Sequence, residues 1–406
     1  MEVLSVVRRR FAAAGALVAA AALVLSGCAN QSGSGPAQTS AAPAPAQPNN
    51  AVLPAGDGQG KCAPGTSIAY VGTLAGQNAA LGQAIANATE LAVNQHNQAN
   101  AGCKVTLVKA DSGGTPDTAV GPTQAVINNQ AVLGIVGLPF SGESKAVGPA
   151  LNAAGLVNIT PSATNPGLTK NGWTNFFRGL GNDAVQGPAA AKWMQGKFNP
   201  QKICVIKDDS DYGIGLATAV SQALGPQVAS CQGDVKTNQK EFSATVGQVQ
   251  QAAPQAIFYA GYYTEAAPLI QQLRDAGVQT PFVAPDGVKD EQFVVNAAGS
   301  ANGSFLTCPC VPQEGFTAFT QAYQQAYNTP PQTYSAEAYD ATTILLQGID
   351  KGANSRPALL NFVRSYNGQG LTKKFQWQPN GELTDTPVYV YRVDGDKIVT
   401  DSPISG

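Results

Sequence analysis

Short apolar runs alternate with longer amphipathic segments along most of this chain, starting near residue 66. An apolar run of about four to eight residues is typical of a buried strand, and apolar positions recurring every three or four residues indicate a helix. The first part of the pattern predicts strands at residues 67–74, 104–110, 131–136 and 156–159, and helices at 81–97, 118–129 and 145–154. Strands that alternate with helices favour an α/β fold, with a parallel sheet covered by helices on both faces.

The alternation begins again after residue 182. The pattern there predicts strands at residues 202–206, 228–230, 256–259 and 281–284, and helices near 214–224, 243–252 and 265–276. A chain of 406 residues is long enough for more than one domain. Two consecutive α/β units therefore indicate two similar lobes.

The C-terminal part has a different character. Residues 331–366 are predicted to be helical, with an interruption near 352–357. Residues 375–399 are predicted to form antiparallel strands, because the turn dipeptides Asn380-Gly381 and Asp394-Gly395 separate segments rich in β-branched and aromatic residues.

The N-terminus carries the pattern of an export signal. Three arginines at residues 8–10 precede an apolar run at 11–25, and small residues then lead to Cys28. This arrangement is typical of a secretory signal, and the run is shorter than the about 20 residues needed to cross a bilayer. Its end resembles the bacterial lipobox, which implies cleavage before Cys28 and a diacylglycerol on the sulfur of Cys28. An ordinary signal followed by an unmodified cysteine is the alternative.

Composition distinguishes the segment after Cys28 from the rest. Residues 29–60 are rich in Ser, Ala, Pro, Gly and Gln, so they cannot bury enough apolar surface to offset the entropy of ordering. We expect a signal peptide at residues 1–27 and a lipidated, disordered tether at 28–60. Without the signal's three arginines and one glutamate, the 24 basic and 26 acidic residues fall to 21 and 25. No Lys and Arg cluster is present, which argues against nucleic-acid binding.

The cysteine count supports an oxidising location. Seven cysteines minus the lipidated one leave six, an even number that suits disulfides outside the cytoplasm. Of the fifteen possible connectivities, we propose the three pairs Cys62–Cys103, Cys204–Cys231 and Cys308–Cys310. No paired C-x-x-C elements occur and His96 is the only histidine, so we predict no metal site.

No catalytic or cofactor motif is present. The chain lacks a G-x-S-x-G element and a Walker sequence, and one histidine supports little acid–base chemistry. We expect His96 to be solvated, since it lies late in a polar helix. The acidic residues Asp208, Asp209 and Asp211 are interpreted as charges at a helix N-terminus rather than as a metal site. The sequence predicts no enzyme and no cofactor.

Seven segments, in order, resemble the leucine/isoleucine/valine-binding protein family, the solute receptors of ABC importers. They are residues 71–76, 160–166, 186–190, 211–216, 240–243, 261–265 and 285–288. The resemblance implies a type I periplasmic binding fold of two Rossmann-like lobes joined by a three-segment hinge. Lobe 1 would comprise 61–180 and 311–370, and lobe 2 would comprise 181–310 and 371–406. The hinge segments would lie near 178–182, 306–311 and 368–374.

The resemblance also implies a site for the two charged ends of an amino acid. Ser141 and Thr164 match hydroxyls that contact the ligand's polar end, and Ala163 would offer backbone groups. A helix N-terminus at Ser141 suits a carboxylate, although from sequence alone a plain N-cap serine is equally common. Asp286 matches the acid that pairs with the ligand ammonium; without the resemblance, an Asp before Gly is more often a turn former.

Other positions concern the walls of the site. Tyr212 and Tyr262 match aromatic walls that close over the ligand from lobe 2. Leu81 stands where the branched-chain receptors have a tryptophan, and Asp286 replaces a longer glutamate. These two departures make strict specificity for Leu, Ile and Val an open question.

Together these features predict a lipid-anchored, monomeric solute-binding protein at the outer face of the cytoplasmic membrane. It would bind a branched-chain or related amino acid in the cleft between its lobes and deliver it to an ABC permease and its ATPases. A sensor for amino acids or amides, which passes its signal to another partner, is the alternative.

Overall fold

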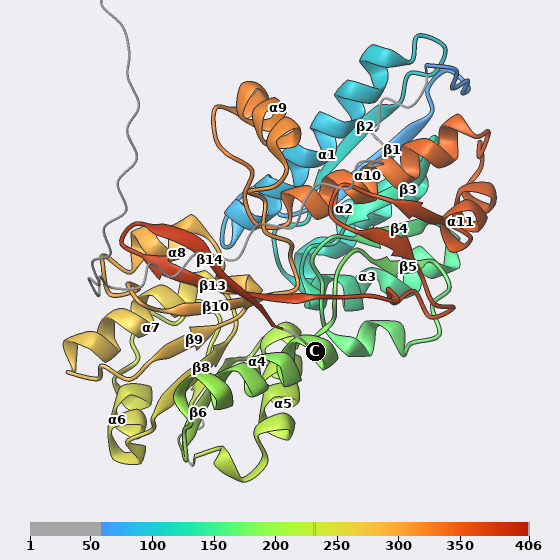
Figure 1. Cartoon of the computed structure of the whole chain (residues 1–406). Coiled ribbons are helices and arrows are strands. Elements are labelled where there is room, and N and C mark those ends of the chain that lie inside the picture. Colours follow the sequence, from blue (N-terminus) through green and yellow to red (C-terminus); the bar gives the residue numbers. More distant parts are fainter. Residues whose placement is uncertain (1–57, 230, 232, 405–406) are drawn as a thin grey trace, which may run out of the picture. The chain divides into compact units, whose positions relative to one another are not determined.

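The computed structural model describes residues 58–229, 231 and 233–404 (Figure 1). The predicted signal peptide, Cys28 and nearly all of the predicted tether lie outside the described residues.

A five-stranded sheet forms from the first part of the chain, in the order β2-β1-β3-β4-β5, with every pair parallel. Its strands are β1 (Ser67–Gly72), β2 (Thr106–Asp111), β3 (Val132–Gly137), β4 (Val157–Thr160) and β5 (Phe176–Arg178). Both faces of β1 are buried: Ile68 and Tyr70 belong to one hydrophobic cluster, and Ala69 and Val71 belong to another. This burial on both faces explains why the strands read as continuous apolar runs.

Helices supply the partners for both faces of this sheet (Figure 1). The side of Ala69 is covered by α2 (Pro116–Asn128) and α3 (Ser141–Ala153). The side of Ile68 is covered by helices that include two from the C-terminal part of the chain: α1 (Ala79–Ala99), α10 (Ser335–Asp350) and α11 (Arg356–Arg364). Helix α9 (Thr317–Tyr327) packs against α1. We use "lobe 1" for this sheet and these helices.

A seven-stranded sheet forms the second unit, in the order β14-β13-β10-β9-β8-β6-β7. Its strands are β6 (Ile203–Asp208), β7 (Asp234–Val235), β8 (Ala256–Ala260), β9 (Phe282–Ala284), β10 (Phe305–Cys308), β13 (Val388–Asp394) and β14 (Lys397–Ile404). The five strands β6 to β10 pair in parallel, whereas β10–β13 and β13–β14 are antiparallel.

The second sheet also has helices on both faces, which we include with it as "lobe 2". One face packs on α4 (Asp183–Phe198) and α5 (Asp211–Leu224), through Val205 and Phe258. The other packs on α6 (Ser243–Ala252) and α7 (Tyr263–Asp275), through Ile206 and Tyr259. The short helix α8 (Glu291–Asn296) contacts α7 and β14. The predicted α/β class with two Rossmann-like units is therefore confirmed.

The C-terminal turns are also where they were predicted. Asp394-Gly395 connects β13 to β14, and Asn380-Gly381 lies between the bridged residues Trp377 and Leu383. Strands β11 (Asn367–Gln369) and β12 (Lys374–Gln376) form a small separate antiparallel sheet.

Some predicted elements differ from the structure. Of the strand expected at 228–230, the described residues 228 and 229 form one bridge, from Val228 to Ile203, and the strand that pairs with β6 at this edge is β7. Helix α3 begins at Ser141, four residues earlier than predicted. Strands β5 and β10 and helices α4, α8 and α9 were not predicted.

Three disulfides join the six cysteines in the pairs proposed from the sequence. Cys62 bonds Cys103, with Cα atoms 4.8 Å apart, Cys204 bonds Cys231 at 5.5 Å, and Cys308 bonds Cys310 at 5.0 Å. The first closes the longest loop, since its cysteines are 41 residues apart.

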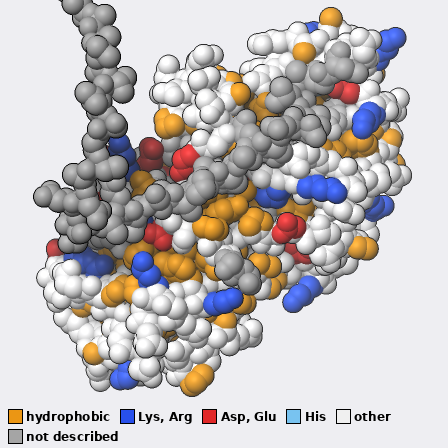
Figure 2. Space-filling view, in the orientation of Figure 1, with side chains coloured by type: hydrophobic (Ala, Val, Ile, Leu, Met, Phe, Trp, Pro, Cys, Tyr) orange, Lys and Arg blue, Asp and Glu red, His pale blue; other side chains and the backbone are white. Residues whose placement is uncertain are grey.

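The described helices are either too short or too polar to cross a membrane. On the face shown in Figure 2, the described Lys and Arg side chains are scattered, with Asp and Glu among them, and form no continuous basic patch.

Candidate functional site

Side chains from both lobes meet around one small cavity. Its volume is about 10 Å³, which is about the space that one water molecule needs. The lining residues are Leu81, Pro139, Phe140, Ser141, Ser162, Tyr212, Tyr262, Asp286 and Tyr334. Five of the seven predicted ligand-binding residues are thus brought together, namely Leu81, Ser141, Tyr212, Tyr262 and Asp286. Ala163 and Thr164 do not line the cavity; they are buried directly after Ser162 in the same loop.

The topology explains why these residues converge. Ser141 follows β3, Ser162 follows β4, Tyr212 follows β6, Tyr262 follows β8 and Asp286 follows β9. All five strands belong to parallel runs, so each residue lies at a carboxyl end. In open α/β sheets this is the edge where ligands bind.

Asp286 is the most strongly hydrogen-bonded group of the cavity. Its Oδ1 accepts from the Tyr212 hydroxyl at 2.6 Å and from Nε2 of Gln186 at 2.8 Å, and its Oδ2 accepts from the Tyr334 hydroxyl at 2.5 Å. Burial raises the pKa of Asp286, and these three donors partly oppose the rise. Burial, followed by the charge of Asp286, raises the pKa of both tyrosines well above the usual value, so each phenol keeps its proton and donates.

Tyr334 and Gln186 were not predicted as part of this site. Tyr334 approaches from the N-terminus of α10, with a left-handed backbone (φ 69°), and joins lobe 1 to an acid of lobe 2. Gln186 lies in a segment that carried the resemblance, but nothing in that segment indicates a contact with a residue 100 positions away.

The charge of Asp286 acts on a second buried acid. Asp183, the first residue of α4, is fully buried. Burial and then the negative charge of Asp286 raise the pKa of Asp183 to about 8, although Thr164 and Arg178 act in the opposite direction. Two buried carboxyl groups that repel each other favour one neutral and one charged partner.

The lobe 1 side of the cavity consists of two cross-linked loops. The Ser141 hydroxyl oxygen accepts from the backbone amide of Asn165 at 3.1 Å, and the Ser162 hydroxyl donates to the Pro139 carbonyl at 2.9 Å. Thr160 Oγ1 accepts from the Ala163 amide at 3.0 Å. These contacts fix the loop after β4 against the start of α3.

Aromatic and polar contacts connect the two lobes around the cavity. The Tyr262 ring centroid lies 5.0 Å from that of Phe140 in lobe 1 and 5.1 Å from that of Tyr212. Nζ of Lys145 lies 2.6 Å from Oδ1 of Asp211. Nδ2 of Asn165 donates to the Asp211 carbonyl, also at 2.6 Å. The described arrangement is therefore one in which the lobes touch.

A larger cavity of about 590 Å³ lies elsewhere, between Lys289, Thr333, Tyr391 and their neighbours. It contains none of the side chains that converge at the strand ends. We take the smaller cavity as the candidate site because buried polar groups from several elements converge there.

The prediction for His96 was wrong. His96 is fully buried, and its Nε2 lies 2.8 Å from Oδ1 of Asp350. Helix α1 turns this face toward α10, a partner that the local polar sequence does not reveal. Among the described residues, His96, Cys103 and Asp350 are the only trio of potential metal ligands close together. Because Cys103 is bonded to Cys62, no thiolate is available there.

A family model described as periplasmic binding protein matches residues 65–397. The chain belongs to the periplasmic binding protein family. The family predicted from the seven sequence segments is thereby confirmed.

Relatives within this family bind amino acids according to their names. The chain is 27% identical to the leucine-, isoleucine-, valine-, threonine-, and alanine-binding protein of Pseudomonas aeruginosa, over 80% of this chain and 88% of the relative. It is 28% identical to the leucine-specific-binding protein of Salmonella typhimurium, over 84% and 95% of the two chains.

Solved structures show the same fold. The branched-chain amino acid transporter substrate binding protein of Streptococcus pneumoniae, in complex with isoleucine, aligns with a TM-score of 0.77 and 26% identity, over 83% of this chain and 98% of that one. A leucine binding protein of Thermotoga maritima aligns with a TM-score of 0.78 and 23% identity, over 84% and 99% of the two chains.

Proposed function

We propose that this periplasmic binding protein captures a free amino acid, branched-chain or related, between its two lobes and delivers it to an ABC importer. The observation that carries the proposal is the buried carboxylate of Asp286 at the strand-end cavity. The relatives that bind leucine, isoleucine and valine by name support the ligand class.

The two sides of the cavity suit the two ends of a zwitterion. Asp286 offers a buried negative charge for an ammonium group. Hydrogen bonds from Tyr212, Gln186 and Tyr334 fix the orientation of its carboxylate. Across the cavity, the Ser141 hydroxyl at the N-terminus of α3 suits a carboxylate. A buried charge that lacks a partner is costly. Pairing with the ligand's ammonium therefore favours the ionised form of Asp286.

Thr164, Ala163 and the apolar walls complete this assignment. In our proposal the loop after β4 presents the hydroxyl of Thr164 and the backbone of Ala163 to the ligand's polar end. Leu81 and the ring of Tyr262 enclose its side chain. Leu81 is smaller than the tryptophan of strict branched-chain receptors. This pocket should therefore accept ligand side chains whose shape differs from that of the ligands of those receptors.

Binding requires the lobes to separate, since an amino acid does not fit in about 10 Å³. We propose hinge segments near 178–182, 306–311 and 368–374, with lobe 1 at 61–180 and 311–370 and lobe 2 at 181–310 and 371–406. Hinge closure around a ligand is a common transition of two-lobed binding proteins. The closed form would then dock on the permease.

The cellular setting follows from the N-terminal sequence. We propose export, lipidation of Cys28, and attachment to the outer face of the cytoplasmic membrane through a tether that ends near residue 60. A monomer on a tether remains near its permease while its lobes are free to move. The function needs no catalysis and no cofactor.

A thermal-shift panel of the twenty amino acids on the mature protein tests the proposal. Ligand at 100 times its dissociation constant adds about 2.7 kcal/mol to the free energy of unfolding, which is a clear shift in melting temperature. Asp286→Ala should abolish the shift, whereas Asp350→Asn, which alters the buried contact with His96 outside the cavity, should keep it. If no amino acid shifts the melting temperature of the wild-type protein, the proposal is refuted.

A further inference from the structure

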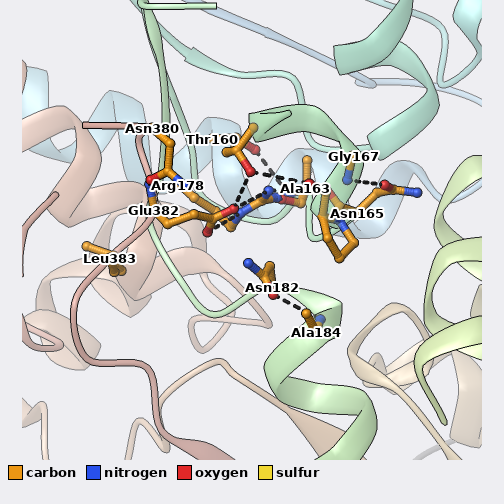
Figure 3. Close-up of polar contacts among 12 residues, drawn as sticks. Thr160, Ala163, Asn165, Gly167, Arg178, Asn182, Ala184, Asn380, Glu382 and Leu383 are labelled. Carbon is orange, nitrogen blue, oxygen red and sulfur yellow. Dashed lines mark hydrogen bonds and ion pairs between the residues drawn. The ribbon is translucent and has the colours of Figure 1, made fainter. Parts of the chain in front are cut away.

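Arg178 connects the proposed ligand loop to a distant segment of the chain (Figure 3). It ends β5 and is fully buried. Its guanidinium donates to the carbonyl of Ala163 and, at 3.1 Å, to the carbonyl of Asn165. Its Nε and one terminal nitrogen also donate to the two carboxylate oxygens of Glu382, each at 3.0 Å. One side chain thus joins the loop after β4 to residue 382.

The backbone around Arg178 strengthens this connection. The Thr160 carbonyl accepts from the Gly179 amide at 2.8 Å, and the Thr164 carbonyl accepts from the Asp183 amide at 3.0 Å. Together with the two carbonyls bound by Arg178, four carbonyls of the loop from 160 to 165 are therefore held by residues 178–183.

The C-terminal segment in turn holds Arg178 through its backbone. The Arg178 amide donates to the Gly381 carbonyl at 3.0 Å, and Nε1 of Trp377 donates to the Arg178 carbonyl at 2.7 Å. Residues 377–382 therefore fix both the main chain and the side chain of Arg178. That segment precedes β13 of lobe 2, which begins at Val388.

Charge gives Glu382 a second effect. Without Glu382, the fully buried guanidinium of Arg178 would be a charge without a partner, which is costly. Burial raises the pKa of Glu382, but the charge and hydrogen bonds of Arg178, with a bond from Thr169 at 2.7 Å, lower it below the usual value. Glu382 thus stays ionised and neutralises Arg178.

We infer that Arg178, oriented and neutralised by Glu382, is a positioning residue that fixes the loop from 163 to 165 for the amino-acid ligand. The inference rests on the proposed function and deepens it. Arg178 does not line the cavity, so it acts through the carbonyls it holds. The bidentate geometry explains why an arginine is needed there, because a lysine cannot bond two carbonyls and a carboxylate in one plane.

The test compares Glu382→Gln with Arg356→Gln as a matched control. Arg356 also binds backbone carbonyls, those of Ile127 and Asn129 at 2.9 Å and Val132 at 3.0 Å, but it lies at the amino end of β3, away from the cavity. We would measure the affinity for L-leucine, L-isoleucine and L-alanine by titration calorimetry. Amide hydrogen exchange of residues 160–166 would be measured without any amino acid.

Glu382→Gln should weaken the affinity about tenfold or more, in line with the loss of a charged hydrogen bond, and should speed exchange at 160–166 at least several-fold. Arg356→Gln should lower the melting temperature and leave both readouts unchanged. Glu382→Asp keeps the charge, so it should retain part of the affinity and part of the protection from exchange at 160–166. Thr169→Val, which removes one donor to Glu382, provides a milder variant with a smaller effect if Glu382→Gln does not fold.

The two readouts separate this inference from the proposed function. Faster exchange with unchanged affinity would overturn the positioning role, as would exchange no faster than in Arg356→Gln. If the wild-type protein binds none of the three amino acids, the proposed function is in doubt, and the exchange at 160–166 decides the inference without a ligand.

Discussion

Replacing Asp183 with asparagine should stabilise the protein, and by more as the pH rises. The pKa of Asp183 is about 8 in the folded protein, through burial and the charge of Asp286, against an ordinary value of 3.8. At a pH between these two pKa values, the carboxyl group of Asp183 is protonated in the folded protein and ionised in the unfolded chain. The free energy of unfolding then falls with pH, by about 1.4 kcal/mol per unit for this group.

The magnitude follows from the two pKa values. Below about pH 4 the acid is protonated in both states, so it contributes no difference. At pH 7, about three units above the ordinary value, the cost of Asp183 reaches about 4 kcal/mol. Asparagine has nearly the same shape and never ionises, so the variant avoids this cost. Because Asp183 is mostly neutral at pH 7, little favourable interaction with the α4 dipole is lost.

Urea unfolding followed by tryptophan fluorescence, at pH 4.5, 6.0 and 7.5, measures the effect. The difference in the free energy of unfolding between Asp183→Asn and the wild type should increase from pH 4.5 to 6.0 and again to 7.5. Asp117→Asn is the matched control, since Asp117 is an acid in the first turn of α2 but is exposed; it should change the free energy by less than about 0.5 kcal/mol. A constant difference for Asp183→Asn, or a variant less stable at pH 7.5, would refute the reasoning.

Three further predictions concern the cavity and the hinge. Tyr334→Phe removes one donor to Asp286 and should weaken amino-acid affinity by about 1–2 kcal/mol; calorimetry that shows no loss would contradict the role of Tyr334. Leu81→Trp should lower the affinity for a large ligand such as L-phenylalanine relative to L-leucine, because the larger ring occupies side-chain space and the branched-chain receptors that the chain resembles have a tryptophan there; an unchanged ratio would remove Leu81 as a specificity residue. Loss of Cys308–Cys310 in the double serine variant should cost only about 1–2 kcal/mol of stability, since so short a loop is closed, yet weaken affinity several-fold. Unchanged affinity would show that this disulfide does not stiffen the proposed hinge.

Regular elements with strong local patterns could be predicted from the sequence. Helix α6 has the predicted bounds, 243–252, because its apolar positions recur with helical spacing. Strand β8 extends the predicted strand by one residue, because a fully buried parallel strand is apolar throughout. The disulfide pairs could also be proposed, because candidate partners stood beside neighbouring apolar runs.

Features that depend on distant partners could not be predicted. Strand β5 is three residues long, and the buried charge of Arg178 is stable only because Glu382 lies beside it, 204 residues away in the chain. His96 is buried for the same kind of reason, through Asp350. Tyr334 reaches Asp286 from another lobe. Local hydrophobic periodicity contains no information about such pairs, so a resemblance to a family was needed for most of the site.

The contacts that hold the two lobes together differ in how they respond to the salt concentration around the protein. The Lys145 and Asp211 side chains are 63% and 32% exposed, so dissolved salt screens their attraction. The bond of the Tyr334 hydroxyl to Asp286 is buried and is screened far less. A rise in salinity should therefore weaken the exposed contact between the lobes and leave the buried contact intact. The dissociation rate of a bound ligand would then depend on the salt concentration, whereas the selectivity for the ligand would not.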